Sequence, residues 1–231
     1  MSSYCDYAPQ KVTTPQRIIH QYSTIYMPQP QKPLDFYFDF ISPFGYFASL
    51  RIDALANQHH RAVNWHAMLL GVSVLKVMGL KPLLETPLKG DYIRRNAQRY
   101  MRLHGVQMAR AIDAPMMDPR AAGRAFYWVK QHRPALAVPL AQAIYHAYWA
   151  HGLDLSTSQA IAAIDLPAEM DAQWLQEGID SAEAKAWLRA AVEQSLAAGV
   201  FGSPTVVVDG EPFWGVETFE QLQQWLRTGG W

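Results

Sequence analysis

The residues with the clearest chemical potential occur in two short segments far apart in the chain. The first, Ser42-Pro43-Phe44-Gly45, follows a short aromatic run and precedes a helical pattern. A hydroxyl at this place lies at a helix N-terminus, where unpaired backbone N–H groups favour an anion such as a thiolate. Ser is also a preferred N-cap, and Pro a preferred first helical residue. Taken alone, these residues favour capping over catalysis.

The second segment, Gly202-Ser203-Pro204-Thr205, comes directly before a β-branched run. A proline at the first residue of a strand does not break the hydrogen-bond ladder. A cis bond at this place would expose the backbone of the preceding residue to a ligand. About 5% of X-Pro bonds in folded proteins are cis, so the base rate favours trans. The sequence leaves the isomer of Pro204 open.

The first segment must be positioned by the elements on either side of it. Residues 34–41 form a short segment that is rich in aromatic side chains and ends at Ser42-Pro43, which predicts a strand running into a turn. Helical spacing follows at Phe47, Leu50 and Leu55. Residues 61–68 form a plausible second strand. This order predicts a β-α-β unit.

From residue 69 to about 199 the pattern changes to long amphipathic stretches punctuated by prolines, which predicts a helical region. Ser181 is a candidate helix start, and Gly199 a candidate stop. The aromatic set Tyr145, Tyr148 and Trp149 is more simply explained as a packed helix face than as a stacking platform for a ligand.

The second segment is followed by a strand closed by Asp209-Gly210 and by a second short strand, which predicts a hairpin with a two-residue turn. A closing helix is predicted over 216–230. A β-α-β unit and a β-β-α unit separated by a helical insertion is the thioredoxin plan, although element order alone leaves other α/β folds open.

Composition excludes several classes of protein. Basic and acidic residues balance at 20 each, so no field attracts nucleic acid. The single cysteine, Cys5, excludes an intramolecular disulfide and favours a reducing cytoplasm. Residues 1–33 predict an extended or disordered arm without a signal peptide, and no apolar stretch is long enough to span a membrane. The histidines lack ligand spacing, so we predict no metal.

Residues 34–49 and 199–222, LDFYFDFISPFGYFAS and GVFGSPTVVVDGEPFWGVETFEQL, together resemble both ends of the 2-hydroxychromene-2-carboxylate isomerases. These are relatives of kappa-class glutathione transferases and of DsbA, and the resemblance extends from Leu34 to Leu226. It implies an α/β thioredoxin-like fold with a large helical insertion. Residues 34–68 and 200–231 would form the thioredoxin-like domain, and residues 69–199 an inserted helical domain.

The resemblance also implies a glutathione site. Ser42, where redox relatives carry a reactive cysteine, would donate to the glutathione thiolate and lower the pKa of the thiol. Ser203 would pair through its backbone with the cysteinyl part of the peptide, so its side chain would matter little. Glu217 would hold the γ-glutamyl ammonium group. The implied binding residues are Ser42, Phe44, Lys89, Ser203, Pro204, Val216 and Glu217.

The expected function is a glutathione-dependent cis-trans isomerase of aromatic oxo-acids. The expected reaction interconverts 2-hydroxychromene-2-carboxylate and trans-o-hydroxybenzylidenepyruvate or a close analogue, and relatives suggest a homodimer. One alternative is a kappa-like glutathione transferase or peroxidase, which consumes glutathione. Another is a non-catalytic thioredoxin-fold binding protein. Leu80 departs from the pattern, since kappa enzymes carry a glutathione-binding asparagine near this position.

Overall fold

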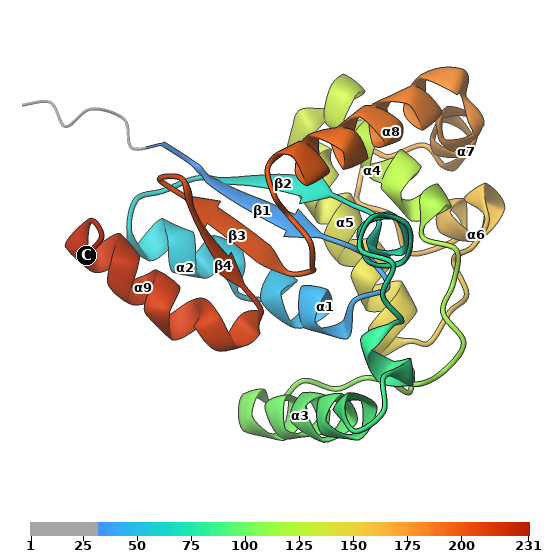
Figure 1. The fold of residues 1–231 in the computed structure, drawn as a ribbon. Helices are drawn as coiled ribbons and strands as arrows, with labels where there is room; N and C mark the ends of the chain where they lie inside the picture. The colour runs from blue at the N-terminus through green and yellow to red at the C-terminus, as the bar shows by residue number, and fades with distance from the viewer. Residues whose placement is uncertain (1–31) are drawn as a thin grey trace, which may run out of the picture. The chain divides into compact units, whose positions relative to one another are not determined.

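The computed structural model describes residues 32–231, so Cys5 and nearly all of the predicted N-terminal arm lie outside the described residues. A mixed four-stranded sheet in the order β2-β1-β3-β4 forms the centre of this part of the chain (Figure 1). Its strands are β1 (Leu34–Phe38), β2 (Val63–Ala67), β3 (Thr205–Val208) and β4 (Glu211–Trp214). β1 runs parallel to β2 and antiparallel to β3, and β3 pairs with β4 in a hairpin.

Alternation along β1 fixes which side chains enter the core. Leu34, Phe36 and Phe38 are buried, whereas the intervening Asp35 and Tyr37 are partly exposed, as period-two alternation requires. Phe36 pairs with Trp65 of β2 on one side and with Val206 of β3 on the other. The end of β1 is thereby anchored in the middle of the sheet, directly before the Ser42 turn.

Helices lie between and beside these strands. α1 (Pro43–Ser49), α2 (Ile52–Gln58) and α9 (Phe219–Thr228) lie together on one side of the sheet (Figure 1). The segment between β2 and β3 is helical, as predicted. It contains η1 (Gly71–Val77), η2 (Leu83–Glu85), α3 (Lys89–His104), α4 (Arg120–His132), η3 (Pro134–Leu136), α5 (Ala137–Tyr145), η4 (His146–Ala150), α6 (Ser158–Ala162), α7 (Ala172–Asp180) and α8 (Ala182–Ala197).

Local sequence signals placed several ends correctly. The predicted hairpin is confirmed, with Asp209 at φ 55° and Gly210 at φ 92° as its two turn residues, and only a few residue types accept these angles. Ser181 caps α8 through the backbone N–H of Ala184, and Gly199 follows the end of that helix with φ 75°. The final helix begins with a short 3₁₀ turn, η5 (Val216–Thr218).

The free edge of β2 is covered by α4. The Tyr127 hydroxyl donates to the carbonyl oxygen of Ala67 at 2.9 Å, and the Lys130 ammonium donates to that of Trp65 at 2.6 Å. These two carbonyls are two residues apart, so both point away from β1 and lack a strand partner. Two side chains of the helical segment therefore replace the missing edge of the ladder.

We expect Tyr127→Phe to lower the free energy of unfolding by about 1–3 kcal/mol, because the buried Ala67 carbonyl loses its donor without a change in packing volume. Chemical denaturation measures the difference. Tyr92→Phe, at an exposed position, is the matched control. Equal stability of the two variants would contradict the proposed role of the edge contact.

The core joins the sheet to the helical segment. Phe38 meets Phe126 of α4 edge to face at 5.3 Å and lies 5.8 Å from Tyr145 of α5. Tyr145, Tyr148 and Trp149 are fully buried, which confirms their predicted place in the core. Among the described residues, no helix is both long enough and apolar enough to cross a membrane.

Candidate functional site at the Ser42 turn

Ser42 lies at the N-terminus of α1, immediately beyond β1. Its side-chain oxygen accepts a hydrogen bond from the backbone N–H of Gly45 at 3.0 Å, and Pro43 is the first helical residue. The capping role expected from sequence is therefore confirmed. The same hydroxyl donates to the carbonyl oxygen of Ser203 at 2.9 Å. This contact joins the two segments that the sequence singled out, 161 residues apart.

The peptide bond between Ser203 and Pro204 is cis. The Ser203 side chain also has a defined partner, because its oxygen accepts the backbone N–H of Asp39 at 2.9 Å. The Ser203 side chain therefore has a structural role that the sequence did not predict, while its effect on peptide binding stays a prediction. A buried N–H without an acceptor is costly, and this hydroxyl supplies the acceptor.

Asp39 is a fully buried carboxylate three residues before Ser42. Its two oxygens accept the backbone N–H groups of Leu70 at 2.7 Å and Ile41 at 3.2 Å. Burial raises the pKa of Asp39 to about 7, against the lowering effect of these donors. The carboxylate thus ties the Ser42 turn to the chain that leaves β2. Sequence reasoning missed Asp39, although a charged residue in an aromatic run was a visible signal.

Gly45 allows α1 to approach the core closely. A Cβ atom built there would lie 2.7 Å from the Tyr145 hydroxyl and 2.8 Å from the Ser203 hydroxyl. The Tyr145 hydroxyl itself donates to the backbone carbonyl of Asp39 at 2.9 Å, and burial raises the pKa of this phenol well above its usual value. The side chain at Ser42 is therefore surrounded by a fixed, hydrogen-bonded network, with 4% of the residue exposed.

Val216 and Glu217 lie next to this network. The backbone N–H of Gly215 donates to the carbonyl oxygen of Pro204 at 2.9 Å, and η5 packs beside α1. Glu217 is exposed, and its carboxylate accepts the side-chain amide of Asn96 on α3 at 2.7 Å. Asn96 was not predicted, because 121 residues separate it from Glu217 and no local pattern joins them.

Phe44 and Lys89, two of the predicted binding residues, lie in different environments. Phe44 is half-buried in the first turn of α1, and its ring meets that of Phe47 edge to face at 5.7 Å. Lys89 is exposed at the first residue of α3, seven positions before Asn96. Within residues 32–231 its ammonium group has no hydrogen bond or ion pair with the other predicted site residues. Its binding role stays a prediction.

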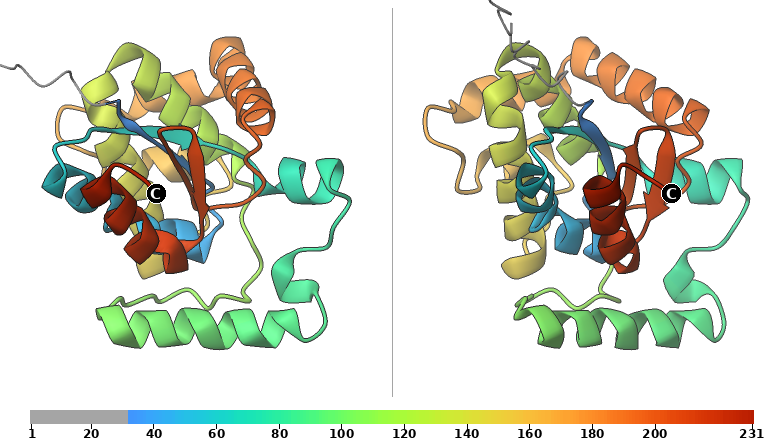
Figure 2. Two further views of the ribbon diagram at one scale, coloured as in Figure 1. Left: turned by 60° about the vertical axis from the view of Figure 1, so that its left-hand side comes forward. Right: turned by 90° about the vertical axis from the view of Figure 1, so that its left-hand side faces the viewer.

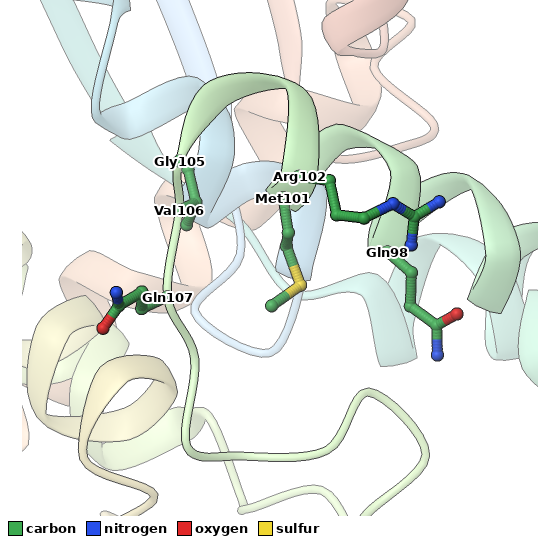
Figure 3. A pocket seen from close by; sticks show the side chains of 6 residues that line it. All are labelled: Gln98, Met101, Arg102, Gly105, Val106 and Gln107. Atoms are coloured by element: carbon green, nitrogen blue, oxygen red, sulfur yellow. The ribbon is translucent and has the colours of Figure 1, made fainter.

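Two cavities, one near α3 and one near α5, do not include Ser42 in their linings. One of about 340 Å³ lies at the C-terminal end of α3 and is lined by Met101, Arg102 and Val106 among others (Figure 3). Another of about 520 Å³ is lined by Tyr46 and Ser49 of α1 and by His146 beyond α5. Tyr46 and Ser49 lie one and two helical turns after Ser42, on the same face of α1.

The chain matches a known family of protein domains. The family model of the DSBA-like thioredoxin domain matches residues 33–227. The chain belongs to the DsbA-like thioredoxin domain family. Two curated proteins named 2-hydroxychromene-2-carboxylate isomerase are similar to it. The one from Pseudomonas putida is 26% identical over 82% of this chain and 92% of its own length. The one from Sphingobium xenophagum is 26% identical over 84% and 98%.

Solved structures show the same DsbA-like fold. A structure of 2-hydroxychromene-2-carboxylate isomerase aligns with a TM-score of 0.68 at 24% identity, covering 83% of this chain and 92% of that chain. The cytosolic disulfide reductase DsbM from Pseudomonas aeruginosa, solved with GSH, aligns with a TM-score of 0.59 at 17% identity, covering 85% and 98%. The relatives' names support an isomerase function within this DsbA-like family.

Proposed function

We propose that the protein is a glutathione-dependent cis-trans isomerase of aromatic oxo-acids, acting on 2-hydroxychromene-2-carboxylate or a close analogue. The observation that carries the proposal is the Ser42 hydroxyl, held at the N-terminus of α1 within 2.9 Å of the carbonyl that precedes a cis-proline. Neither Ser42 nor Gly45 can form a disulfide, so the turn cannot cycle between dithiol and disulfide. Sulfur chemistry at this turn therefore needs a thiol from elsewhere, which we propose is that of bound glutathione.

The turn offers an anionic sulfur two kinds of stabilisation. At the start of α1 the Phe44 N–H favours negative charge, since Pro43 has no N–H and the Gly45 N–H already donates to Ser42 Oγ. The Ser42 hydroxyl is a second donor, which can turn from the Ser203 carbonyl toward the sulfur. A hydrogen bond to the charged form lowers the pKa of the bound thiol. The peptide backbone of glutathione would run along Ser203, with its γ-glutamyl end at Val216 and Glu217.

In the proposed reaction the hemiketal ring of the chromene first opens: the bond between C2 and the ring oxygen breaks, the 2-hydroxyl proton passes to the phenol oxygen, and C2 becomes a ketone conjugated with the cis double bond. The thiolate then adds to this double bond, and the electron pair moves onto the ketone oxygen. The former double bond is now single and rotates. Return of the electron pair re-forms the double bond in its other geometry and expels the thiolate. Glutathione is unchanged, and the covalent intermediate divides one hard rotation into easier steps.

The ultraviolet change of the chromene substrate tests this proposal directly. We expect turnover when glutathione is present at far below the substrate concentration, and no turnover without glutathione or with S-methylglutathione, which has no free thiol. Thiol titration at the end of the reaction should recover all of the glutathione. Consumption of one glutathione per product would instead indicate a transferase. Absence of both turnover and glutathione binding would overturn the enzyme hypothesis.

A further inference from the structure

α3 crosses the thioredoxin-like part of the chain close to Glu217. Figures 1 and 2 show this 16-residue helix on the far side of α1 from the sheet. The Asn96 side-chain amide donates to Glu217 Oε1 at 2.7 Å, and Arg99 Nη2 donates to Asn96 Oδ1 at 2.8 Å. A guanidinium, an amide and a carboxylate therefore form a continuous polar row beside the place proposed for the γ-glutamyl end.

A second set of contacts holds α3 in this position. The ring of Tyr100 stacks on that of Phe47 of α1, with centroids 4.6 Å apart and planes within 10°. Arg51 Nη1 donates to the Tyr100 hydroxyl at 3.0 Å. Because Tyr100 is four residues after Asn96, both side chains lie on the face of α3 that meets α1 and η5. The position of Asn96 thus follows from helix packing.

The partners of Asn96 fix the orientation of its amide. The Arg99 guanidinium can only donate and the Glu217 carboxylate can only accept, so Oδ1 must face Arg99 and the NH₂ group must face Glu217. One of the two N–H bonds serves Glu217. The second N–H bond and the remaining guanidinium donors are available to a ligand that bears a negative charge.

The γ-glutamyl residue carries an ammonium and a carboxylate on one carbon. A carboxylate such as Glu217 recognises the ammonium, but alone it would repel the neighbouring carboxylate of the ligand. A site for this zwitterion therefore needs donors next to its acceptor. Asn96 and Arg99 are donors in that place, and a charge-assisted hydrogen bond between a guanidinium and a carboxylate is among the stronger polar contacts.

Resting on the proposed function, we propose that Asn96 and Arg99 bind the α-carboxylate of the γ-glutamyl residue of glutathione while Glu217 binds its ammonium group. α3 is then part of the peptide site as well as a packing element, and its side chains supply donors next to the Glu217 acceptor. The backbone N–H groups at the start of η5 are the competing donors for the same carboxylate.

Calorimetric titration with glutathione and two of its analogues tests the assignment. Glutaryl-Cys-Gly lacks the ammonium group, and γ-aminobutyryl-Cys-Gly lacks the α-carboxylate. We expect Asn96→Ala and Arg99→Ala each to weaken glutathione binding by about tenfold and to leave binding of the decarboxylated analogue unchanged. Glu217→Gln should weaken glutathione binding and spare the analogue without the ammonium group.

Arg95→Ala is the matched control, because Arg95 is an exposed arginine one turn from Arg99 and has no hydrogen bond or ion pair with any residue in 32–231. It should bind all three peptides like the wild type. Equal weakening of every peptide by Asn96→Ala and Arg99→Ala, or no weakening by either, would assign the carboxylate to the η5 backbone and overturn this inference alone. Failure of the wild type to bind glutathione would overturn the proposed function with it.

Discussion

Ser42→Ala should lower kcat/KM for isomerisation by about 10- to 100-fold, because the thiolate loses a hydrogen bond that contributes about 1.5–3 kcal/mol. The same loss should raise the pKa of bound glutathione by roughly 1–2 units, since one unit corresponds to about 1.4 kcal/mol. Ultraviolet absorbance of the thiolate as a function of pH measures this pKa apart from turnover. Ser42→Thr retains a hydroxyl and should recover much of the activity.

A structural contribution must be separated from the catalytic one, because Ser42 is also an N-cap. Ser181 provides a control with the same local contacts: its hydroxyl accepts the N–H of Ala184 at 3.1 Å and donates to the carbonyl of Gly178 at 2.7 Å. Ser181→Ala should cost about 1 kcal/mol of stability and leave the thiol pKa unchanged. If Ser42→Ala changed stability alone, Ser42 would be a cap and no more.

Asp39→Asn should remove a pH dependence of stability that amounts to about 4 kcal/mol. Burial raises the pKa of Asp39 from its ordinary value of 3.8 to about 7 in the folded chain. Between these values the folded state holds a proton that the unfolded state lacks, so the free energy of unfolding falls as pH rises from about 4 to about 7. At about 1.4 kcal/mol per unit, three units give the stated difference.

Denaturant unfolding of both proteins at several pH values between 4 and 8 checks this expectation. The free energy of Asp39→Asn minus that of the wild type should rise across the window and level off above pH 7. An amide that faces the N–H groups of Leu70 or Ile41 adds a cost, but this cost does not vary with pH. Parallel curves for the two proteins would show that Asp39 does not bind a proton on folding.

Local patterns predicted much of the fold. A short aromatic run ended by Ser42-Pro43 predicted β1, and the Asp209-Gly210 pair predicted the hairpin. Ser42 and Ser181 marked two helix starts, because their signals lie within four residues. The likeness of both chain ends to one family gave the thioredoxin-like plan with its helical insertion. The strand, the hairpin and the two helix starts could be predicted because they depend on backbone preferences that act over one or two turns of chain.

Long-range partners were beyond the reach of such patterns. The contact between Asn96 and Glu217 depends on how α3 packs, and the Ser203 side chain acquires its partner only when β1 and β3 are paired. Asp39 could not be recognised for another reason: its raised pKa results from burial. The alternation of buried and exposed residues in β1 ends at Phe38, so it does not predict that Asp39 is buried. For Lys89, a family motif suggested a binding role, but the motif could not predict where the ammonium group lies in the folded chain.

The close approach at Gly45 bears on how this turn could change during evolution. A pair of cysteines spanning the first turn of α1 from position 42 would place a side chain at Gly45. Any side chain here would meet the hydroxyls of Tyr145 and Ser203 at under 3 Å. A dithiol in this turn would thus need cysteines at positions 42 and 45 and also room made at Tyr145 and Ser203, so no single substitution converts the turn into a site for disulfide exchange.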